Sequence, residues 1–195
     1  LPDSTETLYM KGRTLIELQN PAEAIGYFDR VISAEPGCAM AWFRKGSALV
    51  SMGKFSDAVS VLTQALELKP DNANGWYDRA IALAELEKYD EAVLSYNRAL
   101  EINKKYTNAY YDRGIALAHL GRDQEAIESF DMVAVLDSHF SGAYYHKGLA
   151  LLRLQKYKDA VSAFDAAIAI DPSGKKALFH KGLALLRLMK HEDAV

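Results

Sequence analysis

Apolar residues recur along the chain at steps of three and four, in two blocks that alternate with short polar stretches. Such steps place the apolar residues on one face of an α-helix. The whole pattern repeats every 34 residues without insertion or deletion, so the chain can be aligned to itself as six units. The units cover residues 5–38, 39–72, 73–106, 107–140, 141–174 and, truncated, 175–195.

Each unit predicts two helices joined by a tight turn. The first apolar block spans roughly the first fourteen positions of a unit, and a polar turn such as Gly53-Lys54 follows. The second block starts near the eighteenth position and stops at a proline such as Pro36 or Pro70, because proline cannot continue a helix. The pattern therefore predicts an all-α chain of antiparallel helical hairpins.

Small residues at fixed positions indicate close contact between the two helices of a hairpin. The twentieth position is Ala in all six units, and the twenty-fourth is Phe, Tyr or Leu, large enough to fill the remaining space. The eighth position carries a small residue throughout: Gly12, Gly46, Ala80, Gly114, Gly148 and Gly182.

This pattern resembles the tetratricopeptide repeat, which has a period of 34, an aromatic fourth position, a small eighth, Ala at the twentieth and a proline near the end. The resemblance implies a right-handed α-solenoid that forms one domain over residues 1–195. Three sites depart from the pattern. Ala80 and Lys104 replace Gly and Pro in one unit, and Ser138 replaces Pro in the next. The seventh position is basic in all units, and we expect these long side chains to lie at the rim: Lys11, Lys45, Arg79, Arg113, Lys147 and Lys181.

The two ends of the sequence match parts of further units. Residues 1–4 align with the end of a preceding unit, and residues 191–195 break off early in a second helix. Neither end resembles a polar capping helix, which a solenoid needs at its termini. We therefore expect the chain to be part of a longer array. Exposed apolar ends would also favour self-association.

Composition and charge limit the kinds of partner. Half of the 195 residues are apolar and a quarter are charged, typical of a soluble folded protein. The net charge of −3 gives no overall positive field for nucleic acid, and no apolar run is long enough to span a membrane. The charge is uneven, however. Residues 141–195 hold nine Lys and Arg against five Asp and Glu, a net of +4, and residues 1–140 hold fourteen against twenty-one, a net of −7.

The sequence predicts no catalytic, metal or cofactor site. It contains no glycine-rich phosphate loop, no HExxH and no GxSxG. The five histidines have no pair at ligand spacing, and the lone Cys38 cannot complete a thiolate site or an intrachain disulfide. A single cysteine suits a reducing compartment, so we expect a cytoplasmic protein that is not an enzyme.

The resemblance implies a peptide-binding groove lined by the first helices, at the second, fifth, sixth, ninth, twelfth and thirteenth positions. Asn74 and Asn108, at the second position, could hydrogen-bond a peptide backbone. Aromatic residues at the fifth position either form pockets for a peptide or belong to the margin of the core. They are Tyr9, Phe43, Tyr77, Tyr111, Tyr145 and Phe179.

Positions six and thirteen vary between units and give the predicted groove its charge. The stretch HKGLALLRL occurs twice, at residues 146–154 and 180–188. It places two His–Arg pairs, His146 with Arg153 and His180 with Arg187, two turns apart on one helix face. We expect an acidic peptide or a C-terminal carboxylate to bind there, although a solvated helix face is the alternative. The sixth position reads Met10, Arg44, Asp78, Asp112, His146 and His180.

Four functions compete. The leading one is a non-catalytic protein-interaction scaffold that binds a peptide segment of a partner in the concave groove. The second is nucleic-acid binding, as in pentatricopeptide repeats, but the net acidity, the alanines at position twenty and the prolines argue against it. The third is the recognition arm of a larger enzyme whose catalytic domain lies outside these residues. The fourth is a self-assembling scaffold.

Overall fold

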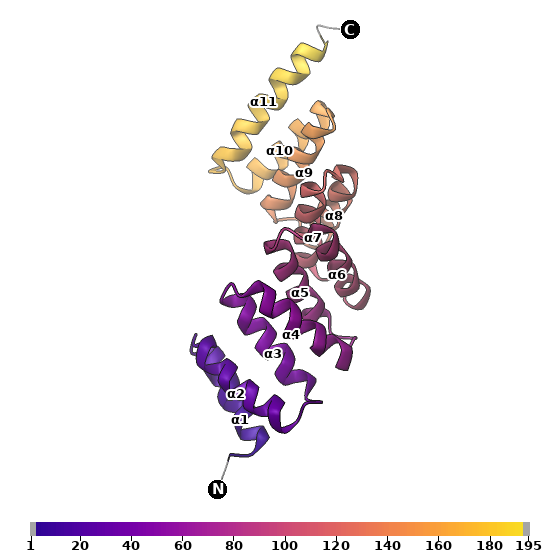
Figure 1. Cartoon of the computed structure of the whole chain (residues 1–195). Coiled ribbons are helices and arrows are strands. Elements are labelled where there is room, and N and C mark those ends of the chain that lie inside the picture. The colour runs from indigo at the N-terminus through magenta and orange to yellow at the C-terminus, as the bar shows by residue number, and fades with distance from the viewer. Residues whose placement is uncertain (1–2, 193–195) are drawn as a thin grey trace. The chain divides into compact units, whose positions relative to one another are not determined.

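The computed structural model describes residues 3–192, with side chains as far as Met189, and all regular elements in this range are α-helices (Figure 1). The predicted hairpins are confirmed: odd-numbered helices correspond to the first blocks and even-numbered helices to the second. The first helices are α1 (Thr5–Glu17), α3 (Ala39–Ser51), α5 (Ala73–Glu85), α7 (Thr107–His119), α9 (Ser141–Arg153) and α11 (Lys175–Glu192). The second helices are α2 (Pro21–Ala34), α4 (Phe55–Leu68), α6 (Tyr89–Ile102), α8 (Asp123–Leu136) and α10 (Tyr157–Ile170).

The turn inside each complete hairpin has one left-handed residue at the fifteenth position of the unit. The N–H of the next residue donates to the carbonyl of the leucine at the eleventh, as in Lys54 N to Leu49 O and Lys156 N to Leu151 O, both 2.9 Å. This is the hydrogen bond of a Schellman motif, which satisfies carbonyls at the helix end. The left-handed residues are Gln19, Gly53, Glu87, Gly121 and Gln155, with φ between 58° and 72°.

The second helices end at the same position whether or not a proline follows. Asn103 and Asp137 cap α6 and α8 with φ of −125° and −145°, and their N–H groups donate to Ala99 O and Val133 O. Lys104 and Ser138 therefore replace proline without moving the helix end. Both helices end at an extended cap residue without a proline.

The last unit differs from the prediction. A turn near residue 189 and a second helix were expected, but α11 continues through Glu192. The position that is left-handed elsewhere is Met189 here. The residue type does not account for this difference, since Gln19, Glu87 and Gln155 adopt the left-handed conformation with side chains as long as that of methionine. Asp193 and Ala194, which were assigned to the second helix, lie outside the described residues, as does Pro2 at the other end.

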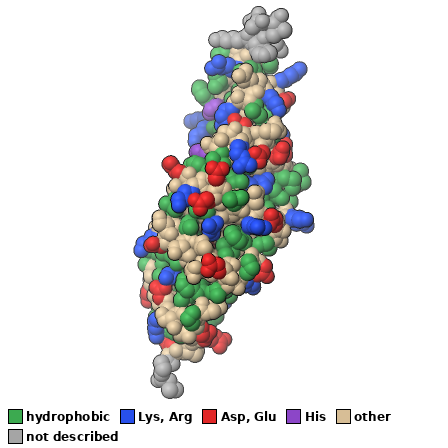
Figure 2. Space-filling model, turned by 45° about the vertical axis from the view of Figure 1, so that its right-hand side comes forward, with side chains coloured by type: hydrophobic (Ala, Val, Ile, Leu, Met, Phe, Trp, Pro, Cys, Tyr) green, Lys and Arg blue, Asp and Glu red, His purple; other side chains and the backbone are tan. Residues whose placement is uncertain are grey.

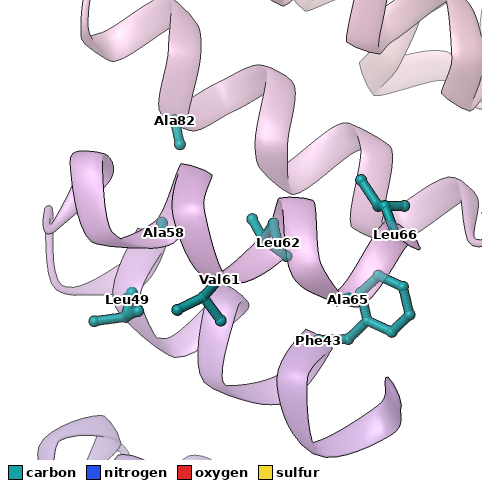
Figure 3. Packing of buried hydrophobic residues seen from close by; sticks show 8 residues of the cluster. All are labelled: Phe43, Leu49, Ala58, Val61, Leu62, Ala65, Leu66 and Ala82. Atoms are coloured by element: carbon teal, nitrogen blue, oxygen red, sulfur yellow. The ribbon is translucent and has the colours of Figure 1, made fainter. Parts of the chain in front are cut away.

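The core of each hairpin is built as the small residues predict. In the last complete hairpin a Cβ added to Gly148 would lie 2.5 Å from Cε1 of Phe164, a fully buried side chain. Leu62 takes the same place over Gly46 in the cluster shown in Figure 3. At Gly46 and Gly148 the absence of a Cβ lets the bulky side chain lie directly against the facing helix.

The chain divides into two compact units, Leu1–Lys104 and Lys105–Val195. Within each unit the hairpins share their apolar cores. In the N-terminal unit Phe43 of α3, Leu62 of α4 and Ala82 of α5 belong to one cluster (Figure 3). In the C-terminal unit α8, α9, α10 and α11 share a second cluster. Each hairpin therefore depends on its neighbours for burial of its apolar surface.

The basic residues at the seventh position connect neighbouring hairpins instead of only lining a rim. Lys11 pairs with Asp3, and the other three lysines each reach an aspartate at the twenty-fifth position of the preceding unit. The latter pairs are partly exposed, so each contributes about 0–1 kcal/mol. These pairs and their N–O distances are Lys45–Asp29 (2.6 Å), Lys147–Asp131 (2.5 Å) and Lys181–Asp165 (2.5 Å).

Arginine at the seventh position has a different partner. Arg79 donates from Nε to Thr63 Oγ1 at 3.1 Å and from Nη1 to Ser95 Oγ at 2.6 Å. Thr63 occupies the aspartate position of the preceding unit, and Ser95 lies in the same hairpin as Arg79. Arg79 thus meets a hydroxyl at the position where Lys45, Lys147 and Lys181 meet a carboxylate.

Candidate functional site

The first helices form the inner layer of each unit. In the N-terminal unit α1 contacts α3 and α3 contacts α5, and in the C-terminal unit α7 contacts α9 and α9 contacts α11. Within each described unit the second helices contact only first helices, not one another. The predicted groove positions lie on this layer of first helices, the inner layer.

The tyrosines at the fifth position lie half in the core and half on the surface of this layer. All four are partly exposed, and each contacts the large residue at the twenty-fourth position of its own hairpin. Burial raises the pKa of Tyr145, and burial together with the charge of Asp112 raises the pKa of Tyr111. The ring centroids are 6.0 Å apart in Tyr9–Phe28, Tyr77–Tyr96 and Tyr111–Phe130, and 6.1 Å apart in Tyr145–Phe164.

Phe43 and Phe179 depart from this arrangement in opposite directions. Phe43 was expected in the groove, but only 6% of it is exposed, so the structure places it in the core. Its ring lies against Gly75, where an added Cβ would overlap it. The matching position is alanine in the neighbouring units at Ala41 and Ala109, so Gly75 makes room for the deeper ring. Phe179 of α11 is 69% exposed.

A polar cluster on α3 and α5 occupies the inner layer of the N-terminal unit. Ser47 donates its hydroxyl to the Asp78 carboxylate, and the exposed Arg44 lies near the same carboxylate. Burial raises the pKa of Asp78, and the Ser47 hydrogen bond and the Arg44 charge oppose that shift. Asn74 is exposed one turn before Asp78. Sequence reasoning identified the charged members but missed Ser47, at the ninth position.

The corresponding positions of α7 carry Asn108 and Asp112. Asn108 is exposed and Asp112 is partly buried beside the Tyr111 ring, whose pKa its charge helps to raise. The two side chains repeat the Asn74 and Asp78 pair of α5 at the same positions of the unit. The inner layer of each described unit therefore carries an amide and a carboxylate one turn apart.

The two groove histidines pack between hairpins. The His146 ring centroid is 5.7 Å from Tyr111 and 5.9 Å from Phe130. The His180 ring is 5.6 Å from Tyr145, and its Nδ1 donates to the carbonyl of Lys176 at 2.8 Å. Each histidine therefore covers the aromatic pair of the preceding hairpin, so both contribute to packing and leave only part of the ring on the surface.

Basic groups surround His146. Burial lowers its pKa, and the nearby charges of Arg153, Lys176 and His119 lower it further. This shift favours the neutral form of the imidazole, so His146 is a weaker source of positive charge than an unperturbed histidine. Figure 2 shows histidine side chains next to Lys and Arg side chains along one edge of the C-terminal part.

The structure gives the two predicted anion-binding arginines different environments. Arg153 donates from Nε and Nη2 to Oδ1 of Asp123, at 2.7 and 2.6 Å, and the Asp123 side chain is only 8% exposed. Its charge is therefore already paired within the chain, and its binding of a ligand stays a prediction. Arg187 has Tyr157 where Arg153 has Asp123, and it forms no ion pair among the described side chains. Asp123 is the only acidic residue at the seventeenth position of the aligned units. This difference was the signal in the sequence for the ion pair with Arg153.

The described residues offer neither a metal-ligand cluster nor a membrane-spanning helix. No cluster of three or more His, Cys, Asp or Glu side chains between residues 3 and 192 could hold a metal ion. None of the helices in the same range combines the length and the apolar character needed to cross a bilayer.

Known structures with the same fold are numerous. YrrB, described as a TPR protein with an unusual peptide-binding site, is 24% identical over 92% of both chains, with a TM-score of 0.85. A crystal structure of MamA is 25% identical, covers 88% of this chain and 94% of MamA, and has a TM-score of 0.82. MamA from Desulfovibrio magneticus RS-1 is 21% identical, covers 89% of this chain and 98% of that MamA chain, and has a TM-score of 0.82.

Family models agree with the fold. One tetratricopeptide repeat model matches residues 9–51, 44–107 and 145–195, and a second matches residues 95–128. No curated protein matches the sequence significantly. The matched segments, the 34-residue period and the shared hairpin packing all agree, and the chain belongs to the tetratricopeptide repeat family.

Proposed function

We propose that this chain is a non-catalytic scaffold that binds an extended peptide segment of a partner protein along the inner layer of first helices. The observation that carries the proposal is the inner layer itself. Its packing positions are nearly constant, whereas its exposed polar positions differ from unit to unit. Support also comes from YrrB, which shares the fold and is described as having a peptide-binding site. We place the protein in the cytoplasm, with its one free cysteine, Cys38.

In the N-terminal unit the polar cluster suits a peptide backbone. Asp78, held by Ser47, offers a carboxylate to backbone N–H groups, Arg44 offers donors to carbonyls, and Asn74 offers both. The adjacent Tyr77 supplies apolar contact area at low entropic cost. Because Asp78 is already oriented by a hydrogen bond, little side-chain freedom is lost when a peptide binds.

In the C-terminal unit we propose that the bound segment is acidic. Residues 141–195 carry a net charge of +4, and Arg187 and His180 lie on the inner layer of α11. Helix α7 of the same unit adds polar and aromatic side chains to the proposed surface, namely Asn108, Tyr111 and Asp112. Arg153 is left out of the proposed contact set because Asp123 holds it, and Phe43 is left out because it is buried.

The test begins with selection of dodecamer peptides from a random library on the purified chain. Binding of the selected peptides is then measured by calorimetry on the parent and on the N74A/D78A variant. We expect the double variant to lose at least about tenfold in affinity, since two directed hydrogen bonds are removed. The matched control is Q64A/E67A, which removes an amide and a carboxylate from the exposed second helix α4. If the parent and N74A/D78A bound every selected peptide with equal affinity, the inner layer would be ruled out as the peptide-binding surface.

Self-association is a second candidate, favoured by the apolar side chains that α11 exposes. Leu178, Phe179, Leu186 and Met189 are each between 49% and 69% exposed. A second copy of the chain could cover them. Sedimentation equilibrium should then show a mass that rises with concentration in the parent and not in L186E. A constant monomer mass across the accessible concentrations would exclude it.

A further inference from the structure

A pocket of about 410 Å³ opens at the N-terminal ends of α9 and α11, inside the C-terminal unit. Its lining is mostly apolar and includes the small residues Gly142, Ala167 and Ala177 together with Tyr145. A volume in this range holds a small ligand or one large side chain with the backbone on either side of it. Because Tyr145 and Gly142 occupy groove positions of the repeat, the pocket lies at the edge of the inner layer.

The rim of this pocket is basic. Lys175 and Lys176 line it, both are exposed, and neither forms an ion pair among the described side chains. Asp171 lines it too, but its Oδ1 accepts from the N–H of Ser173 at 3.1 Å and from the Ser173 hydroxyl at 2.6 Å. The Asp171 carboxylate is thus tied to its own loop, and the two ammonium groups remain available to a ligand.

The positive field extends from the pocket to the inner layer. The Tyr145 ring that lines the pocket is 5.1 Å from the His146 ring. The charge of Lys176 reaches His146 and helps to lower the pKa of its imidazole. A negative ligand seated at Lys176 would therefore be detectable at His146, because a carboxylate there would raise that pKa again.

We propose that this pocket binds an apolar side chain of an acidic peptide segment, with flanking Asp or Glu side chains on Lys175 and Lys176. Successive residues on a helix point roughly 100° apart, so the two lysines address two separate carboxylates better than one terminal carboxylate. A purely ionic ligand would leave the apolar lining of the pocket uncovered. A segment that also carries an apolar side chain therefore fits the pocket better. The inference rests on the proposed function and names the chemistry of the segment at one end of the surface.

The probe is a fluorescent peptide, acetylated and amidated at its ends, with one leucine between two pairs of glutamates. Anisotropy at low salt should detect binding to the parent, and we expect K175E/K176E to bind at least about tenfold more weakly. The matched control K156E/K158E makes the same change in net charge on exposed lysines outside the pocket and should bind like the parent. Acidic residues in the first turn suit the helix dipole, so K175E/K176E should retain the parent circular dichroism spectrum.

Two further comparisons test the apolar anchor and the position. Replacing the leucine of the peptide by serine should weaken binding to the parent, and replacing the glutamates by glutamines should abolish it. Titration of His146 by NMR should show a raised pKa when the glutamate peptide is bound. The pocket assignment is overturned if the peptide fails to bind the parent, if both double variants bind alike, or if the His146 pKa stays constant on binding.

The two proposals fail in different ways. If library peptides bind and depend on Asn74 and Asp78 but the glutamate peptide does not depend on Lys175 and Lys176, only the pocket assignment is lost. If no library peptide depends on the inner layer but the glutamate peptide still requires both lysines, the pocket stands and the extended binding surface is lost.

Discussion

The nine residues HKGLALLRL occur in α9 and again in α11, yet the two copies have different surroundings. In α9 Gly148 lies against Phe164, Leu151 is 4% exposed and Arg153 pairs with Asp123. In α11 no described heavy atom lies within 4 Å of a Cβ placed on Gly182, and Leu185 is 41% exposed. The same residues therefore lie in the core and in an ion pair in α9 but on the surface in α11. The difference arises because each contact also needs a partner residue on a facing helix.

The largest expected difference between the copies is the change in the free energy of unfolding when Gly148 or Gly182 is replaced. Gly148→Ala should lower the free energy of unfolding by about 1–2 kcal/mol, because the new methyl group collides with Phe164 and this outweighs the gain in helix propensity. Gly182→Ala should raise it by about 0.5–1 kcal/mol, since only the propensity term remains. Urea unfolding followed by circular dichroism measures both. Effects of the same sign at the two sites would contradict the packing described for α9.

The next difference is at the two arginines. Arg153→Ala should cost about 1 kcal/mol, because it leaves the buried Asp123 carboxylate without its cation. Arg187→Ala should change stability by less than about 0.5 kcal/mol, as expected for an exposed side chain. The double variant D123N/R153A serves as the control for coupling and should cost less than the sum of the two single changes. Additive costs would show that the ion pair contributes nothing.

The residues at the C-terminal ends of the two copies should give a smaller difference in stability. Gln155 is left-handed at φ 58°, so Gln155→Gly should stabilise the chain by about 0.5–1 kcal/mol. Met189 lies within α11, so Met189→Gly should destabilise it by up to about 1 kcal/mol. Unfolding curves of the two variants should shift in opposite directions. A stabilising Met189→Gly would indicate that α11 prefers a turn at that residue.

The pH dependence should give the smallest difference. The pKa of His146 is lowered in the folded chain, so the unfolded chain takes up its proton first as the pH falls below about 6.5. Stability is thus unaffected above that pH, falls below it, and stops falling once the folded His146 is also protonated. His146→Gln should flatten this decline in urea midpoints between neutral and mildly acidic pH. An unchanged decline in His146→Gln would place the responsible group elsewhere.

Much of the fold could be predicted because each complete hairpin meets a similar neighbour. The observed helices fill positions 1–13 and 17–30 of a unit, within about two residues of the boundaries that the apolar steps indicate. The prediction was wrong at α11, where Met189 replaces the residue that makes the turn. A repeated pattern predicts which elements recur, but the residue type at the fifteenth position does not decide the turn, since Gln19, Glu87 and Gln155 make it with side chains as long as that of methionine.

The candidate site was harder to predict because its residues depend on partners about 30 positions away. Phe43 is buried because Gly75 lies opposite it, and Arg153 is neutralised because Asp123 lies opposite it. Both partners stand out in the aligned units as the one glycine and the one acidic residue at their positions. The sequence alone does not say which positions of neighbouring units touch, and that requires the structure.

The lysine–aspartate links between hairpins also explain how such an array can grow. The unit at residues 141–174 carries both partners: Lys147 pairs with the hairpin before it, and Asp165 pairs with Lys181 of the helix after it. A tandem gene duplication of such a unit therefore brings both halves of a new junction at once. The copied hairpin fits beside its parent without further mutation, and its exposed positions are then free to diverge toward a new ligand.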